Sequence, residues 1–393
     1  MTERILGAYE TGRPGPTVVV VGAIHGNEPS GLLALERVLT QLRRAEVPLR
    51  GRFLALVGNA RAHAAGERYL QRDLNRDWVP DAVDALRARD PALDGPEDHE
   101  QRALLAVLDP LLAQAAGPMV FLDLHSMSSH GPPFAVLGDT LRNRTVALSL
   151  CIPTVLGLDE TIDGTLMSWL VEQGHVGVGV EAGQHDDPAS IDVHTSIVWL
   201  ALEAAGAVDE DCCPWLPDHR RSLRGHALEL PPVLEIRHRQ RTFDGDGFVM
   251  RPGFRNFDRV TKGQPLADDA EGVIEATLDG HVMLPRYQPR GDDGFFLATP
   301  VRPFWLDLSA RLRRGSLERW ITHLPGVHPH PERPDHYVVD PGMARHQLVN
   351  LFHLFGYRRR HAEGERLVFS RRRPDHGAPA PDAAEPGPIE GDR

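Results

Sequence analysis

Two side chains that can bind a metal follow the first apolar run of the sequence. The stretch GAIHGNEPSG places His25 and Glu28 three residues apart, in a loop that leads into a helix. One turn can aim both side chains at a single point, and an imidazole nitrogen with a carboxylate oxygen suits zinc. An H-x-x-E pair alone arises by chance in a chain with 20 histidines. Its place at the carboxyl end of a strand, where open α/β sheets bind ligands, is what favours a metal site.

A third metal ligand is predicted at His125. Catalytic zinc usually binds three protein groups and keeps one position for water, and His125 ends the apolar run MVFLDLH. Asp123, two residues earlier, points to the same side of a strand and could orient an imidazole from behind. The alternative for His125 is a buried histidine that bonds only to the backbone.

Two arginines and an asparagine lie between these ligands, in the segment RDLNRDW. Arginine grips a carboxylate with a bidentate fork and stabilises a developing oxyanion. Arg72 and Arg76 could therefore serve one task each. A solvated charged loop is the alternative interpretation of this segment.

A carboxylate that could act as general base ends a later strand. Glu181 closes the alternating stretch HVGVGVE. Beside a metal, such a carboxylate can take a proton from water and pass it to a leaving amine. An exposed glutamate at a sheet edge is equally compatible with this segment taken alone.

Apolar runs separated by helical patterns must position these side chains. The runs lie at residues 17–24, 52–57, 119–124 and 176–180. The helical patterns lie around 32–42, 98–115, 163–173 and 189–205. This alternation predicts an α/β fold with a mainly parallel sheet flanked by helices, which would bring the candidate residues to one edge of the sheet.

Changes in residue pattern and composition along the chain predict four regions. We expect a catalytic α/β domain over residues 1–215, because acidic residues, cysteines and prolines interrupt the periodicity at its end. Short alternating stretches and Asp-Gly pairs predict a small β domain over 230–300. An α+β extension over 301–373 should contain a helix near 342–355 and a basic hairpin after it. The composition of 374–393 is typical of a disordered tail.

Composition excludes several other classes of protein. The net charge of -12 argues against nucleic acid or an anionic membrane as a partner. Three cysteines cannot build a disulfide framework, and no signal peptide or 18-residue apolar run occurs. We therefore expect a cytoplasmic protein that acts on a small molecule, and the sequence is compatible with an oligomer.

The motifs GAIHGNEPSG, RDLNR and VEAG, together with the strand-ending His125, resemble the succinylglutamate desuccinylase and aspartoacylase family, a branch of the zinc carboxypeptidase-like fold. They cover residues 17–185. The resemblance implies that His25, Glu28 and His125 hold one Zn²⁺ per chain. It also implies that Glu181 is the general base toward a metal-activated water.

The resemblance further implies which residues contact the substrate. Arg72 would stabilise the oxyanion, Asn75 and Arg76 would hold the α-carboxylate, and Tyr287 would approach from the β domain. Aspartoacylase-like members carry another arginine shortly before the catalytic glutamate, which binds the side-chain carboxylate of the substrate. This sequence has no arginine at 145–219, which argues against acetylaspartate.

The expected activity is hydrolysis of the amide bond of an N-acyl amino acid. Two alternatives remain open from the sequence. One is a zinc carboxypeptidase that uses the same ligands and the same arginines on a peptide C-terminus. The other is a non-catalytic binding protein that keeps the fold and uses the extension to contact a partner.

Overall fold

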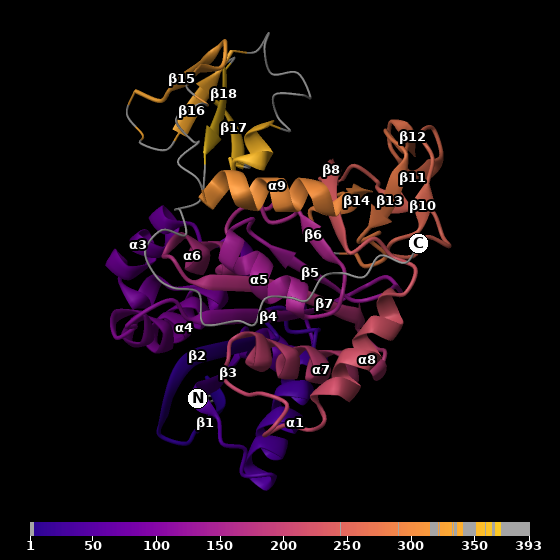
Figure 1. Ribbon diagram of the computed structural model, residues 1–393. Helices are drawn as coiled ribbons and strands as arrows, with labels where there is room; N and C mark the ends of the chain where they lie inside the picture. The colour runs from indigo at the N-terminus through magenta and orange to yellow at the C-terminus, as the bar shows by residue number, and fades with distance from the viewer. Residues whose placement is uncertain are drawn as a thin grey trace.

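The computed structural model describes residues 4–243, 245–289, 291–314, 321, 323–331, 333, 336–340, 351–357, 359–363 and 366–370. Its centre is a sheet of eleven strands in the order β1-β3-β2-β4-β7-β5-β6-β8-β14-β13-β10 (Figure 1). Seven strands lie in the region expected to be the catalytic domain, residues 1–215, which is called the catalytic part below. They are β1 (Ile5–Glu10), β2 (Arg13–Gly22), β3 (Arg50–Val57), β4 (Val120–Met127), β5 (Phe134–Leu137), β6 (Thr154–Leu156) and β7 (Val176–Gln184). Strands β3, β2, β4 and β7 run parallel to one another. The predicted α/β fold with a large, mainly parallel sheet is confirmed.

Helices cover both faces of the parallel strands. One apolar core includes side chains of α1 (Ser30–Arg44), α5 (Leu141–Ser149), α7 (Ala189–Ala204) and α8 (Leu216–Ala227). The other includes α3 (Pro80–Ala88), α4 (Pro96–Ala113) and α6 (Leu166–Glu172). A short helix, α2 (Ala60–Ala65), follows β3. Because helices cover the two faces of the sheet, the loops that follow the parallel strands meet at the carboxyl ends of these strands.

Strand β2 shows why the run Val18–Val21 is apolar at every position. Val18 and Val20 of β2 pack into one core, and Val19 and Val21 pack into the other. Successive side chains of a strand point to opposite faces, so a strand covered on both sides needs a continuous apolar run.

The sheet continues past the expected boundary of the catalytic domain. Strand β8 (Val233–Arg241) pairs in parallel with β6, and β14 (Asp293–Pro300) pairs with β8. Strands β13 (Gly280–Met283) and β10 (Arg259–Val260) extend the same sheet. A separate three-stranded sheet contains β9 (Val249–Met250), β11 (Pro265–Asp269) and β12 (Gly272–Glu275). The predicted β-rich region over 230–300 is therefore joined to the catalytic part by main-chain hydrogen bonds.

The C-terminal extension begins with helix α9 (Pro303–Arg314), which lies across the catalytic part. Beyond it, β15 (Val327–Pro329), β16 (His336–Val339), β17 (Arg359–Glu363) and β18 (Arg366–Ser370) form a four-stranded sheet. Strands β17 and β18 are the expected basic hairpin. Of the helix expected at 342–355, residues 351–354 are helical, and residues 342–350 lie outside the described part. The tail at 374–393 also lies outside it.

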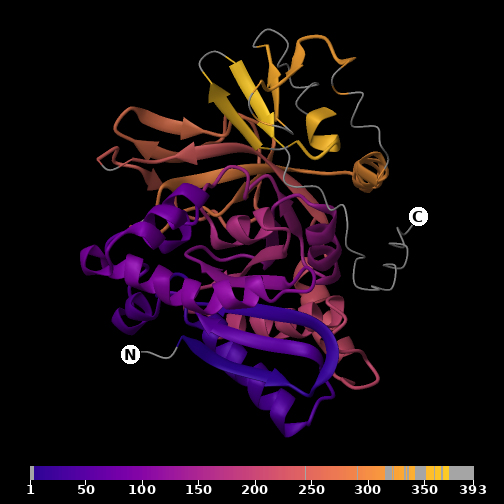
Figure 2. The same cartoon turned by 90° about the vertical axis from the view of Figure 1, so that its left-hand side faces the viewer.

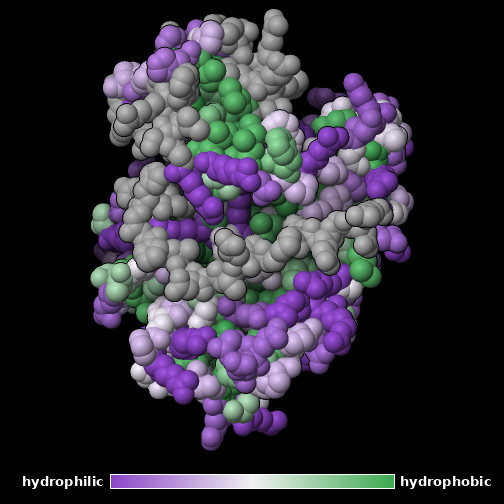
Figure 3. Space-filling view, viewed as in Figure 1, coloured by the Kyte–Doolittle hydropathy of each residue, from purple (hydrophilic) through white to green (hydrophobic). Residues whose placement is uncertain are grey.

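Figure 2 shows the extension and the β-rich region side by side above the catalytic part. In Figure 3, hydrophilic residues cover the visible face of α9, and hydrophobic residues gather above it within the extension.

A buried ion cluster fastens the extension to the catalytic part. Asp139 precedes α5 and binds Arg144 of α5, with Nε–Oδ1 2.5 Å apart. Arg313 of α9 binds the same carboxylate at 2.7 Å and donates to the Asp139 carbonyl at 2.8 Å. Arg313 is only 3% exposed and Asp139 only 4%. Both guanidinium groups therefore share one buried carboxylate as their partner inside the protein.

Candidate metal centre

The loop after β2 holds the first two predicted ligands against each other. His25 Nδ1 lies 3.0 Å from Glu28 Oε1, and both side chains are buried. The Glu28 N–H donates to the His25 carbonyl at 3.2 Å, which closes the turn. Between them, a Cβ on Gly26 would lie 2.2 Å from the Ala62 carbonyl carbon. The turn therefore needs glycine at this position.

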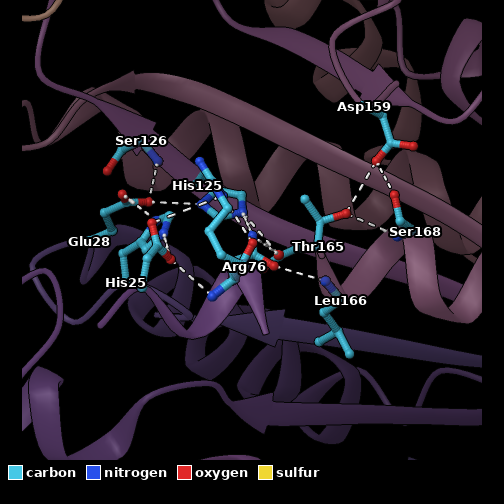
Figure 4. Close-up of polar contacts among 12 residues, drawn as sticks. His25, Glu28, Arg76, His125, Ser126, Asp159, Thr165, Leu166 and Ser168 are labelled. Carbon is cyan, nitrogen blue, oxygen red and sulfur yellow. Dashed lines mark hydrogen bonds and ion pairs between the residues drawn. The ribbon is translucent and has the colours of Figure 1, made fainter. Parts of the chain in front are cut away.

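His125 reaches the same carboxylate from strand β4. Its Nδ1 lies 3.2 Å from Glu28 Oε2, and the Ser126 N–H donates to that oxygen at 3.0 Å. Figure 4 shows His25, Glu28, His125 and Ser126 gathered in one group. One ligand atom from each of His25, Glu28 and His125 lies within 4.8 Å of the other two. The structure thus brings the three predicted ligands together.

Carboxylates stand behind both imidazoles. His25 Nε2 lies 3.0 Å from Asp73 Oδ1, and His125 Nε2 lies 2.9 Å from Asp123 Oδ2. Each ring therefore has Nδ1 toward Glu28 and Nε2 toward a second acid. This arrangement fixes the orientation of a metal-binding histidine and raises its basicity. Asp123 has the position that its spacing from His125 predicted, whereas Asp73 had no such signal.

The charges of the cluster favour an ionised Glu28. Burial alone would raise the pKa of Glu28, but His25 and His125 lower it well below its ordinary value. Burial also opposes ionisation of Asp73, yet His25 and Arg68 hold its pKa well below the usual range. Two imidazoles and a carboxylate of this kind fit a divalent ion such as zinc.

Glu181 occupies the neighbouring strand at the same level. It pairs in register with His125 across the parallel strands β4 and β7. Burial raises the pKa of Glu181 to about 8. Its Oε2 atom is buried and has no hydrogen-bond partner among the described residues. The carboxylate lines the same pocket as the three ligands.

The arginine beside the candidate metal ligands is Arg68, not Arg72. Arg68 Nη2 lies 2.9 Å from His25 Nε2, and Nη1 lies 3.2 Å from Glu28 Oε1. Arg72 instead binds Asp77 and Asp98, each at 2.5 Å, and does not line the pocket. The prediction chose an arginine inside the RDLNR motif, and the neighbouring acids draw that side chain away. Arg68 sits in GERYL, a context without a metal or carboxylate pattern.

Comparison with known proteins shows which family the part of the chain that carries this site resembles. Residues 14–196 match the model of the succinylglutamate desuccinylase/aspartoacylase catalytic domain. This part of the chain, residues 14–196, belongs to the family.

Curated relatives match only part of their own length. A probable aspartoacylase of Parasynechococcus marenigrum is 34% identical over 174 residues, which cover 42% of this chain and 52% of the relative. A succinylglutamate desuccinylase of Burkholderia pseudomallei is 30% identical over 110 residues, or 28% of this chain and 30% of the relative. The matched stretches thus span about half of these relatives or less.

Solved structures of the desuccinylase/aspartoacylase family share the fold. A succinylglutamate desuccinylase/aspartoacylase from Rhodobacter sphaeroides superposes with a TM-score of 0.54 at 19% identity, covering 75% of this chain and 87% of that chain. The ectoine utilization protein EutE (DoeB) from Ruegeria pomeroyi gives a TM-score of 0.53 at 21% identity, with 74% and 87% covered.

The predicted carboxylate-binding pair, Asn75 and Arg76, also lines the pocket. Asn75 is buried, and its Oδ1 accepts from the Leu166 N–H at 2.9 Å while its Nδ2 faces Asp123 at 3.4 Å. Arg76 Nη1 donates to the Asn75 carbonyl at 2.9 Å. Figure 4 shows Arg76 between the metal ligands and Leu166.

Tyr287 is not placed among the pocket-lining residues. Its hydroxyl donates to the carbonyls of Arg251 or Phe254, at 2.9 and 3.1 Å, and accepts from the Phe254 N–H. Its neighbours in sequence, Arg286 and Gln288, line the pocket instead. The predicted contact between Tyr287 and substrate is corrected accordingly, because the hydroxyl is engaged by the 251–254 turn.

No helix in the described ranges is both long and apolar enough to cross a bilayer.

Proposed function

We propose that the chain is a zinc-dependent hydrolase that cleaves the amide bond of an N-acyl amino acid. The convergence of ligand atoms from His25, Glu28 and His125 within 4.8 Å carries the proposal. The match of residues 14–196 to a family named for a desuccinylase and an acylase supports a deacylase reaction.

The metal would be held by the two Nδ1 atoms and the Glu28 carboxylate. When bound, a divalent ion in such a site polarises a carbonyl and makes a water molecule acidic. Asp73 and Asp123 keep the imidazoles in the orientation that this binding needs.

Glu181 is the residue that moves the proton. Its carboxylate has a buried oxygen without a partner among the described side chains, and it lies in register with His125. It would take a proton from the attacking water and pass it to the leaving nitrogen. A pKa of about 8 lies near neutrality, where a group can both accept and return a proton.

Two arginines divide the remaining tasks. Arg68 lies against His25 and Glu28, so it can donate to the carbonyl oxygen as negative charge develops there. Arg76 and Asn75 line the pocket farther along and would bind the α-carboxylate of the amino acid.

The test joins a metal assay to a substrate panel. Purified protein should contain about one zinc per chain and should hydrolyse N-acetyl amino acids faster than dipeptides. Faster cleavage of the dipeptides would favour the carboxypeptidase. A protein that binds zinc but cleaves neither series would contradict the hydrolase and favour a binding role.

A further inference from the structure

The wall of the pocket beside Arg76 is built by the segment between β6 and α6. The Leu166 N–H donates to Asn75 Oδ1, and the Trp78 N–H donates to the Gly164 carbonyl at 3.0 Å. Gly164 has a φ of 73°, and a Cβ there would lie 2.1 Å from the Arg76 carbonyl oxygen. The segment is thus pressed directly against the two residues that would hold the α-carboxylate.

A side chain on the amino acid would therefore meet this wall. In an α-amino acid the side chain branches from the carbon next to the carboxylate. If Arg76 and Asn75 hold the carboxylate, the first atoms of the substrate side chain lie next to residues 158–167. The character of this wall then decides which side chains fit.

The wall is apolar. Leu158, Ile162 and Met167 line the pocket. Leu158 and Ile162 pack in the same apolar cluster as Val136 and Phe296, which line it too. Burying an apolar substrate side chain against such a surface is favourable because both surfaces leave water.

The charged side chain that this wall contributes to the pocket lining is acidic. Asp159 lines the pocket and accepts hydrogen bonds from Ser168 at 2.7 Å and Thr165 at 3.2 Å, as Figure 4 shows. Residues 157–167 contain no arginine, lysine or histidine. A substrate carboxylate placed here would lose its hydration without gaining a cation and would face Asp159.

The other cations of the described pocket are engaged elsewhere. Arg68, His25 and His125 belong to the metal end. Arg286 donates to the Gly291 carbonyl, and its guanidinium lies over the Phe248 ring, 4.9 Å from the centroid. Both contacts hold Arg286 to the β-rich region.

We propose that the substrate is an N-acyl derivative of an amino acid with an apolar, uncharged side chain, which lies against Leu158, Ile162 and Met167. The proposal rests on the hydrolase function proposed above. It separates this chain from an enzyme for acylated aspartate or glutamate, whose side chains are anionic.

The first test compares substrates that differ only in the side chain. With zinc-loaded protein, kcat/KM should be at least about tenfold higher for N-acetylleucine, N-acetylmethionine or N-acetylphenylalanine than for N-acetylaspartate or N-acetylglutamate. A preference for the acidic pair would overturn the proposal and would point to Arg286 as the partner of their carboxylate.

A binding measurement keeps this inference separate from the hydrolase proposal. Free leucine and free aspartate carry the same α-carboxylate and α-amino group, so their difference in affinity reports how the pocket receives the side chain. Calorimetry on the zinc-loaded protein should give tighter binding for leucine. If leucine binds better and no acylated substrate is cleaved, the hydrolase proposal fails while the side-chain assignment stands. Tighter binding of aspartate would contradict the assignment of an apolar side chain, whether or not the protein hydrolyses acylated substrates.

An introduced cation should reverse the selectivity. Ile162 is half-buried at the pocket surface, so Ile162→Arg adds a charge beside the predicted side-chain site. The ratio of leucine to aspartate affinity, or of their kcat/KM values, should fall at least about tenfold. The matched control is Leu148→Arg on α5, an exposed position outside the pocket, which should leave the ratio unchanged. An unchanged ratio in a folded Ile162→Arg protein counts against the proposal.

Discussion

His125 and Glu181 occupy paired positions on the adjacent parallel strands β4 and β7. One strand thereby presents a candidate metal ligand and the next presents a carboxylate, at one level of the sheet. Main-chain hydrogen bonds set this spacing, so it does not depend on a flexible loop.

Replacing Glu181 should separate metal binding from proton transfer. Glu181→Gln keeps the shape of the side chain but removes the base. We expect zinc content to stay near that of the wild type and kcat to fall about 100-fold or more. Zinc analysis and steady-state kinetics measure the two effects, with the exposed Glu36→Gln as control. A variant that turns over at the normal rate would exclude Glu181 as the base.

The two candidate arginines should differ sharply when each is replaced. Arg68→Gln removes the cation beside His25 and Glu28 and should lower kcat about 100-fold, the effect of losing an oxyanion donor. Arg72→Gln breaks contacts with Asp77 and Asp98 and should mainly lower stability. Comparing kcat per folded molecule with the thermal midpoint distinguishes them. The reverse pattern would restore the role first assigned to Arg72.

The acid behind His125 should tune metal affinity. Asp123→Asn keeps an oxygen near Nε2 but loses the negative charge that now lies 2.9 Å from it. We expect zinc affinity to fall about 10- to 100-fold, measured by competition with a chromogenic chelator. The exposed Asp81→Asn on α3 serves as control. Equal affinities for Asp123→Asn and wild type would mean that Asp123 does not support the ligand.

Stability should depend on pH through His194. This imidazole is fully buried in α7 and donates from Nε2 to the His125 carbonyl at 3.0 Å. Burial lowers the pKa of His194 to about 3. As the pH falls below about 6.5, the unfolded chain gains a proton at His194 while the folded protein does not. Stability is therefore lost between about pH 6.5 and pH 3.

The matched variant His194→Gln can donate the same hydrogen bond but cannot titrate. Between pH 7 and pH 5, the free energy of unfolding of the wild type should fall by about 2 kcal/mol more than that of the variant. Urea unfolding at both pH values measures the difference. Parallel pH dependence of the two proteins would show that His194 contributes nothing to it.

The ion cluster beneath α9 should be worth more than a surface pair. Arg313→Met removes one cation from buried Asp139 and leaves Arg144 in place. We expect a loss of about 3 kcal/mol in the free energy of unfolding, at the lower end of the cost of breaking a buried pair. Arg221→Met breaks an exposed pair with Asp218 and should cost less than about 1 kcal/mol. Similar losses in the two variants would show that the buried cluster does not fasten the extension.

The sequence by itself determined the sheet and the three residues whose ligand atoms converge. Apolar runs such as 17–24 allow few structures other than a strand buried on both faces. The residues that end these runs must then gather at one edge, which is why His25, Glu28 and His125 could be named beforehand. The family and the parallel α/β fold followed from the same motifs, and the relation to zinc carboxypeptidases stays a prediction.

Only the tertiary structure decided which arginine faces the metal ligands and where Tyr287 points. A long side chain can bind any acid within its reach, and those acids come from segments distant in sequence. Arg72 meets Asp98 of α4, and Arg68 meets Glu28 and Asp73. The continuation of the sheet from β6 into β8 was equally hidden, because pairing between strands separated by some eighty residues depends on how the intervening helices pack.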